Sequence, residues 1–224
     1  MNQKPLENPL ANKSSGKVIM PFGPPVYVGK LSEEVLNEIQ THIENVREDY
    51  SRDMGERLAG RIREQYAITD LCSEDVYNHL SSHLKNAHEG VEVITGYKFN
   101  QFDYTSCQID SLWVNIQRAN EYNPPHLHDG MWSFVLYTKN DMTFEEALDN
   151  HFDNQKGQTL AGSLELRYGE MNWMNFSQYQ HWPEVGDIVI FPSWLQHCVH
   201  SFYKEGAERI SVAGNFQFVG NANG

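Results

Sequence analysis

The spacing of hydrophobic residues changes at about residue 97, and this change limits the possible folds more than any other feature of the chain. Apolar and polar side chains alternate over residues 112–116 and again over 132–136. Short apolar runs, separated by Gly, Asn, Asp and Pro, follow at 160–167, 186–191 and 208–218. A period of two between turn residues is typical of half-buried antiparallel strands. We therefore expect residues 97–219 to form a β-rich core, either a sandwich or a barrel.

The residues before this point show a helical period instead. Ser32 precedes two glutamates and is suited to cap a helix whose apolar residues recur on one face. A second helix, with its own apolar stripe, is expected to begin near Ser73. His79 and His83 lie four residues apart on this helix, and we interpret them as part of a solvated face because no third metal ligand is near. Helices are thus expected mainly over residues 31–90.

The length and composition indicate a single folded domain. The chain has 224 residues, 40% of them hydrophobic, which is enough for one core that folds alone. Residues 1–17 are rich in Asn, Lys and Ser and are expected to form a flexible tail. The domain should therefore span residues 18–224.

Charge and cysteine content narrow the class of protein. With 17 Lys and Arg against 30 Asp and Glu, the formal net charge is −13, which disfavours binding to nucleic acid or to anionic membranes. Cys72, Cys107 and Cys198 are scattered, which favours a reducing compartment. No apolar run approaches the roughly 20 residues that span a membrane, and the N-terminus lacks the apolar stretch of a secretory signal. We expect a cytoplasmic protein, in the host cytoplasm if the protein is viral. The oligomeric state stays open, a homodimer being one option.

Three histidines have the spacing of a metal site. His126 and His128 are two residues apart, so in an extended segment both side chains point the same way. The prolines just before them end a strand, where pockets are often built. His197 follows a hydrophobic run and a Pro-containing turn and would complete a three-ligand face with open positions. His200, three residues later, is the weaker candidate. A face of two histidines and a carboxylate with open positions is typical of non-haem Fe(II).

A cationic side chain follows the third histidine. Arg209 lies on the next predicted strand, and Ser211 points to the same face. The planar guanidinium matches a carboxylate with two parallel hydrogen bonds, and the serine adds a hydroxyl donor. The pair therefore predicts an anchor for an anionic co-substrate beside the metal.

In this order, the motifs resemble those of the Fe(II)- and 2-oxoglutarate-dependent dioxygenases. The signature of that superfamily is HxD or HxE, a distal His, and an Arg followed two residues later by Ser. Three further segments are similar to a subgroup common in phage and marine-bacterial genomes: Phe22–Tyr27, Trp113–Asn115 and Phe191–His197. The resemblance covers about residues 20–219. It implies a mainly β fold with flanking N-terminal helices around a double-stranded β-helix, the jelly-roll or cupin-like core.

The resemblance also implies an enzyme and a role for each site residue. Fe(II) would be held by His126, His197 and a third ligand. The co-substrate 2-oxoglutarate would chelate the iron and pair its far carboxylate with Arg209, helped by Ser211, and dioxygen would take the remaining position. The implied reaction is hydroxylation of a C–H bond in a peptide, protein or small-molecule substrate, with decarboxylation of 2-oxoglutarate to succinate.

The chain departs from the superfamily pattern at one position. His128 stands where the carboxylate is expected, and Asp129 would supply it only if the backbone bulges. A face of three imidazoles also admits a cupin-type metalloprotein that does not use 2-oxoglutarate. Against it, the Glu expected shortly after HxH is absent. A further alternative is a non-catalytic jelly-roll binding module whose histidines are incidental.

Residues 140–182 form a stretch that is long for a loop on a β scaffold. It carries four aromatic residues, Trp173, Phe176, Tyr179 and Trp182. Long loops on such scaffolds often cover binding sites. We interpret the segment as a candidate substrate lid, with ordinary packing of the aromatic residues as the alternative.

Overall fold

The computed structural model describes residues 16–20, 23–56, 58, 60–96, 107–148, 160–170, 172–173 and 177–219. Of the predicted tail, residues 1–15 lie outside the described residues, and Gly16 and Lys17 begin the first strand. No helix in the described ranges is both long and apolar enough to cross a membrane.

Both long helices come before residue 97 and eight strands follow it, but three described strands also precede it, and residues 97–106 lie outside the described residues. The described elements are β1 (Gly16–Ile19), β2 (Val26–Lys30), α1 (Glu33–Val46), the 3-10 turn η1 (Tyr50–Arg52), β3 (Glu64–Ala67), α2 (Glu74–Thr95), β4 (Cys107–Gln117), β5 (Asn123–His126), β6 (Trp132–Asn140), α3 (Phe144–Leu148), β7 (Leu164–Arg167), β8 (Gln178–His181), β9 (Asp187–Pro192), β10 (Gln196–Val199) and β11 (Arg209–Phe218).

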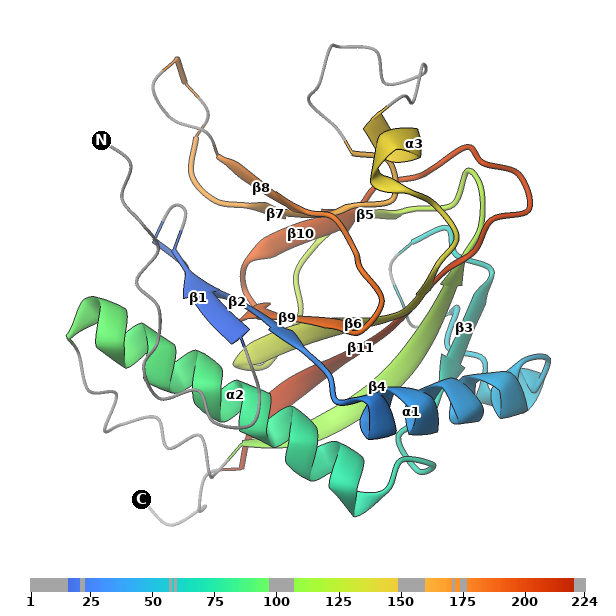
Figure 1. The fold of residues 1–224 in the computed structure, drawn as a ribbon, viewed down its shortest axis with the longest axis horizontal. Helices are drawn as coiled ribbons and strands as arrows, with labels where there is room; N and C mark the ends of the chain where they lie inside the picture. Colours follow the sequence, from blue (N-terminus) through green and yellow to red (C-terminus); the bar gives the residue numbers. More distant parts are fainter. Residues whose placement is uncertain are drawn as a thin grey trace.

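The strands form two antiparallel sheets. The larger sheet has the order β1-β2-β9-β6-β11-β4-β3, and the smaller has the order β5-β10-β7-β8. In Figure 1, α1 and α2 cover one side of the larger sheet, and the smaller sheet lies on its other side. The fold is therefore mainly β with flanking N-terminal helices around a jelly-roll core, as predicted.

Alternation along the central strands divides the interior into two layers. In β6, Phe134 and Leu136 join the core packed under α1 and α2. Val135 and Tyr137, between and after them, join the layer between the two sheets. Successive side chains of a strand point to opposite faces, so each central strand serves both layers. The layer between the sheets is the one that receives the site residues.

The two long helices begin where the sequence predicts. The Ser32 hydroxyl accepts from the backbone N–H of Val35 at the start of α1, and the Ser73 hydroxyl accepts from that of Val76 at the start of α2. Such caps satisfy backbone donors that have no partner inside the helix. Helix α2 ends at Gly96, whose φ of 71° is the left-handed conformation that glycine adopts without strain.

The predicted solvated face of α2 is wrong for His83, which is fully buried at 0% exposure. The Nε2 atom of His79 accepts from the backbone N–H of Ser32 at 3.2 Å, so it carries no proton. Nε2 of His83, 3.1 Å away, must therefore donate to it. Nδ1 of His83 is then the acceptor for the Tyr27 hydroxyl at 2.8 Å. Burial lowers the pKa of His83 to about 3, so this chain of bonds between β2, α1 and α2 is held by a neutral ring.

The interpretation of residues 140–182 as one long loop is wrong. The segment contains α3, β7 and β8. Tyr179 packs in the layer between the sheets, and Trp182 packs edge-to-face on Phe144 with ring centroids 5.9 Å apart. Trp173 is 92% exposed, and Phe176 lies outside the described residues. Two of the four aromatic residues are thus packing residues of the smaller sheet and its connections.

Candidate metal centre

The three predicted histidines meet between the two sheets. His126 ends β5, His128 follows two residues later, and His197 lies in β10 directly opposite His126 in the strand register. The ring centroids of His126 and His197 are 4.2 Å apart, and that of His128 lies 4.9 and 5.0 Å from them. One nitrogen from each ring lies within 4.8 Å of the others, so the three could hold a metal ion.

Hydrogen bonds to the backbone orient two of these rings. Nδ1 of His126 lies 2.7 Å from the carbonyl oxygen of Pro124, and Nδ1 of His197 lies 2.9 Å from that of Leu195. A carbonyl oxygen only accepts, so each Nδ1 carries the proton and each Nε2 keeps its lone pair. Metal-binding histidines in proteins are oriented by such bonds. Both rings therefore present the nitrogen that a metal needs.

Burial keeps two of the imidazoles neutral. The pKa of His197 falls to about 3, first because its charged form would be desolvated and then because His126 lies beside it. The pKa of His128 falls to about 4 for the same two reasons, although Asp129 opposes the shift. At neutral pH the rings of His128 and His197 are therefore uncharged, which is the protonation state that a metal ligand requires.

Asp129 lies outside this group. Its side chain is exposed, and its carboxylate oxygens are not among the atoms that converge with the histidine nitrogens. The bulge that would bring the carboxylate inward is not present, because His128 donates its backbone N–H to Ser193 and its ring occupies the third place.

Arg209 begins β11 and is 1% exposed. Its Nε donates to Oε1 of Gln117 at 2.6 Å, and its guanidinium carbon lies 5.3 Å from the centre of the Tyr137 ring. Among the described residues, its Nη1 is buried without a hydrogen-bond partner. Arginine stays protonated in proteins, and a buried cation without a partner costs several kcal/mol. An anion in the pocket could therefore pair with the free Nη1 of this guanidinium.

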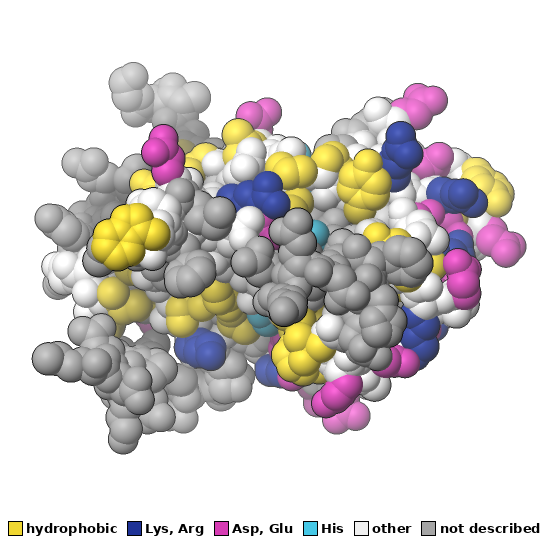
Figure 2. Space-filling view, turned by 90° about the horizontal axis from the view of Figure 1, so that it is seen from above, with side chains coloured by type: hydrophobic (Ala, Val, Ile, Leu, Met, Phe, Trp, Pro, Cys, Tyr) yellow, Lys and Arg dark blue, Asp and Glu magenta, His cyan; other side chains and the backbone are white. Residues whose placement is uncertain are grey.

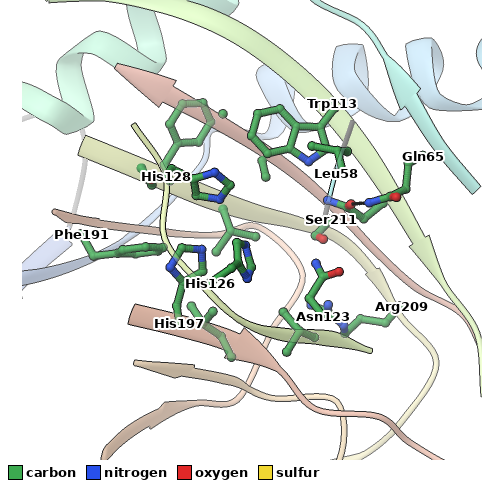
Figure 3. Close-up of a pocket in the computed structure, with 18 residues that line it drawn as sticks. Leu58, Gln65, Trp113, Asn123, His126, His128, Phe191, His197, Arg209 and Ser211 are labelled. Atoms are coloured by element: carbon green, nitrogen blue, oxygen red, sulfur yellow. Dashed lines mark hydrogen bonds between the residues drawn. The ribbon is translucent and has the colours of Figure 1, made fainter. Parts of the chain in front are cut away.

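One cavity of about 50 Å³ joins the histidines to Arg209. In Figure 3 the three rings lie on one side, Arg209 lies on the other, and Asn123 and Ser211 lie between them. The volume is room for about four water molecules, which suits a small ligand. Three imidazole nitrogens facing one guanidinium suit a divalent transition metal bound to a small anion.

Three residues on β4 were given no role by the sequence analysis, although Trp113 and Asn115 belong to one of its motif segments. Trp113, Asn115 and Gln117 alternate along the strand and face the pocket side of the sheet. The Trp113 ring lies 5.8 Å from that of His128, and Asn115 accepts from Gln65 at 2.7 Å. Their spacing of two was a usable signal, but their roles depend on partners far away in the chain.

Gln117 is the most consequential of these residues. It is fully buried, and its Nε2 donates to the backbone carbonyls of Glu121 and His200 at 2.6 and 3.0 Å. Its amide is thus fixed, and Oε1 is left to accept from Arg209. Gln117 therefore orients the guanidinium without neutralising it.

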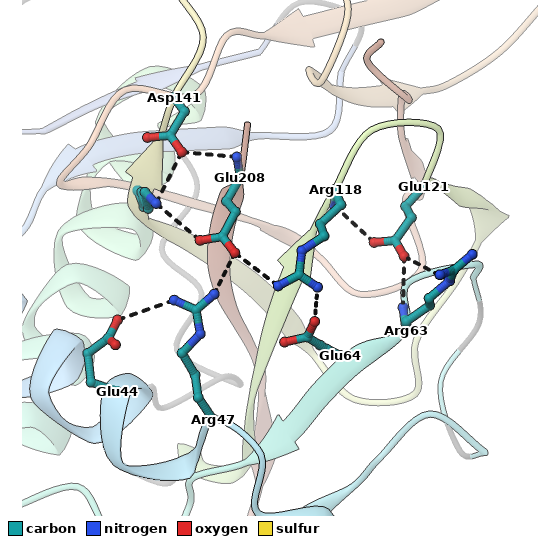
Figure 4. A network of polar contacts seen from close by, with 9 residues as sticks. Glu44, Arg47, Arg63, Glu64, Arg118, Glu121, Asp141 and Glu208 are labelled. Carbon is teal, nitrogen blue, oxygen red and sulfur yellow. Dashed lines mark hydrogen bonds and ion pairs between the residues drawn. The ribbon is translucent and has the colours of Figure 1, made fainter. Parts of the chain in front are cut away.

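The carboxylate of Glu208, the residue before Arg209, bonds other cationic side chains instead of Arg209. Glu208 bonds Arg47 and Arg118 through one oxygen and Lys139 through the other (Figure 4). This network joins α1, β4 and β6 at the start of β11. Arg209, one residue on, points to the other face. On the face seen in Figure 2, many of the described Lys and Arg side chains lie near Asp or Glu. Arg209, in contrast, is buried and lines the pocket.

Comparison with known proteins points to the same chemistry. Residues 111–215 match the model of a family described as "Putative 2OG-Fe(II) oxygenase", where 2OG is 2-oxoglutarate. No curated protein matches the sequence. The fold is similar to that of a prolyl-4-hydroxylase from Pseudomonas putida, with a TM-score of 0.52 and 14% identity over 85% of this chain and 89% of that one. It is also similar to a prolyl hydroxylase from Trichoplax adhaerens, solved with a hypoxia inducible factor peptide fragment, with a TM-score of 0.51 and 14% identity over 91% and 83%.

Proposed function

We propose that the chain is a 2OG-Fe(II) oxygenase that hydroxylates a C–H bond of a peptidyl side chain, because residues 111–215 match the model of that family. The superfamily uses Fe(II), 2-oxoglutarate and dioxygen. When bound, these groups supply the oxidising chemistry, in which one oxygen atom enters the substrate as 2-oxoglutarate becomes succinate and carbon dioxide. The protein's share is to bind, orient and shield the reactants.

In this proposal Nε2 of His126 and Nε2 of His197 are two ligands of the iron, and a ring nitrogen of His128 is the third. The fixed Nδ1 protons of the first two rings support this assignment. Three imidazoles leave the metal site one charge unit more positive than a site with a carboxylate. An incoming dianion offsets that charge, so the site relies on its co-substrate more than a two-histidine site does.

The far carboxylate of 2-oxoglutarate pairs with Arg209 and takes a further hydrogen bond from Ser211. The unpartnered buried Nη1 of Arg209 is the observation that carries this proposal. A bidentate arginine–carboxylate contact is among the strongest hydrogen-bonded contacts that a protein makes. Because the Arg209 guanidinium is already buried and held in place, little has to rearrange when the carboxylate binds. Gln117 holds the guanidinium at the required angle.

A peptide substrate is supported by apolar side chains beside the histidines. Leu127 is 57% exposed and Trp194 is 54% exposed. The bond from His128 N–H to the carbonyl of Ser193 brings the two segments together, and Trp194 packs edge-to-face on Tyr168. Exposed apolar residues beside a polar pocket suit an extended chain whose one side chain enters the pocket. Since a solved structure of similar fold holds a peptide, prolyl peptides are the first substrates to test.

The test starts with anaerobic spectroscopy of the purified chain. We expect an absorption band that appears only when Fe(II) and 2-oxoglutarate are both present, and slow conversion of 2-oxoglutarate to succinate once air is admitted. Peptide substrates should then gain the mass of one oxygen atom in step with succinate. His126→Ala is the control that removes the metal.

Two results would count against parts of this proposal. Iron binding that is unaffected by 2-oxoglutarate would favour the cupin-type alternative. If a small molecule but no peptide stimulated the turnover of 2-oxoglutarate, the proposal of a peptidyl substrate would be wrong. The assignment of 2-oxoglutarate as co-substrate would still hold.

A further inference from the structure

Strand β10 carries a second group of possible ligands on the face turned away from His197. Cys198 lies directly opposite Glu165 in the register with β7, and His200 follows Cys198 by two residues. Because side chains alternate along a strand, these three share the outer face of the smaller sheet. The two-residue repeat thus places two candidate ligand groups back to back on one strand.

The contacts within this group are close and mostly buried. Nε2 of His200 lies 2.7 Å from Oε2 of Glu165 and 3.9 Å from Sγ of Cys198. Glu165 is 2% exposed and Cys198 is 4% exposed, whereas His200 is partly open to solvent. One donor atom from each residue lies within 4.8 Å of the others.

We propose that Glu165, Cys198 and His200 form a second metal site, for a borderline divalent cation of the Zn(II) type. Thiolate, imidazole and carboxylate are the three ligand types that Zn(II) takes in proteins. Its bonds of about 2.0–2.3 Å place ligand atoms roughly 3.3–3.8 Å apart. The Cys198–His200 pair already has nearly this spacing, and a small rotation of the carboxylate opens the Glu165–His200 pair.

The neighbouring side chains permit the exchange of a proton for a metal. Arg167 bonds Oε1 of Glu165, whereas His200 bonds Oε2. Gln180 Nε2 also donates to Oε2, at 3.3 Å. A cation at Oε2 therefore replaces the His200 and Gln180 contacts and leaves the Arg167 contact in place. The partly exposed His200 edge provides the route of entry.

The metal-free state is stable by itself, which makes the site testable by substitution. Burial would lower the pKa of His200, but hydrogen bonds to Cys198 and Glu165 outweigh it and raise the pKa to about 9. His200 and Glu165 therefore form an ion pair in the absence of a metal. Loss of the Cys198 sulfur removes a ligand and leaves that pair intact.

Cobalt(II) titration of the metal-free, full-length chain tests the proposal, because a thiolate bound to Co(II) gives a charge-transfer band in the near ultraviolet. The three-histidine site contains no sulfur, so it cannot produce this band. We expect two Co(II) per chain and a thiolate band. Cys198→Ser should abolish the thiolate band and reduce binding to one Co(II) per chain. His126→Ala should keep the band and also bind one Co(II) per chain, because it loses the three-histidine site.

Cys72→Ser is the matched control and should leave the band unchanged. Burial raises the pKa of the Cys72 thiol to about 12, so this sulfur is a poor ligand. Glu165→Gln keeps the side-chain shape and should weaken Co(II) binding at the thiolate site at least tenfold. A wild-type chain without a thiolate band, or a band that survives Cys198→Ser in a folded protein, would overturn the second site.

Discussion

Replacing Arg209 with Met should separate co-substrate binding from stability. Arg209 is buried, its Nη1 has no partner among the described residues, and its Nε is held by Gln117. Met preserves much of the side-chain length without the charge. The substitution therefore removes the anion-binding group and the uncompensated buried cation together.

The two effects differ in magnitude. Truncating one partner of a buried, hydrogen-bonded charge pair costs about 2–5 kcal/mol of binding free energy. The dissociation constant for 2-oxoglutarate should therefore rise roughly 30-fold to 1,000-fold or more. For the unliganded chain, replacing a buried ion with an apolar group gains roughly 1–4 kcal/mol. An unsatisfied Gln117 oxygen costs about 1–3 kcal/mol. These terms oppose each other, so the free energy of unfolding should fall by no more than about 2 kcal/mol and rise by no more than about 3 kcal/mol.

Calorimetric titration of 2-oxoglutarate into the anaerobic metal-loaded protein measures the first effect, and urea unfolding of the metal-free protein measures the second. Fe(II) affinity should change far less than 2-oxoglutarate affinity. Arg118→Met, which removes a half-exposed arginine from the Glu208 network, is the matched control and should leave co-substrate affinity unchanged. If Arg209→Met lost 3 kcal/mol or more of stability and kept its 2-oxoglutarate affinity, Arg209 would be a structural cation and the reasoning would be refuted.

Three further predictions, which use four substitutions, test neighbouring parts of the site and fold. His128→Ala should abolish tight Fe(II) binding while Asp129→Ala leaves it within about threefold, and iron titration giving the reverse would make Asp129 the ligand. Gln117→Leu should raise KM for 2-oxoglutarate about tenfold with little change in Fe(II) affinity, because it frees the guanidinium; equal loss of both would indicate general misfolding. His83→Gln should make the free energy of unfolding depend less on pH below pH 6.5. Below pH 6.5 the unfolded chain takes up a proton that folded His83, with a pKa of about 3, does not. Wild-type stability should therefore fall by up to about 1.4 kcal/mol per pH unit from this residue alone. If wild type and His83→Gln lost the same free energy of unfolding between pH 7 and pH 5, this account would be contradicted.

The sequence predicted those parts of the site that depend on local periodicity. The spacing of His126 and His128, and of Arg209 and Ser211, decides which face of a strand each side chain occupies. The order of the motifs then brings these faces together in a jelly roll. A different local signal, a serine followed by acidic residues and a helical apolar period, placed the starts of α1 and α2 at Ser32 and Ser73.

The sequence did not predict features that depend on distant partners. His83 is buried because Tyr27 and His79 satisfy its ring, and Tyr27 lies 56 residues away. Gln117 matters because Arg209 is its cross-strand neighbour, 92 residues later. Strand β3 lies within residues 31–90, where mainly helices were expected. It has the short sequence EQYA and is defined by its pairing with β4.

The most direct test of the central claim is a crystal structure of the chain with 2-oxoglutarate and Mn(II), which replaces Fe(II) without reacting in air. The account predicts one metal ion bonded to ring nitrogens of His126, His128 and His197 at roughly 2.0–2.3 Å, in the range of metal–imidazole bonds. It also predicts 2-oxoglutarate on that ion, with its far carboxylate on Nη1 of Arg209. A metal held by Asp129, or a co-substrate whose carboxylate leaves Arg209 unpaired, would contradict it.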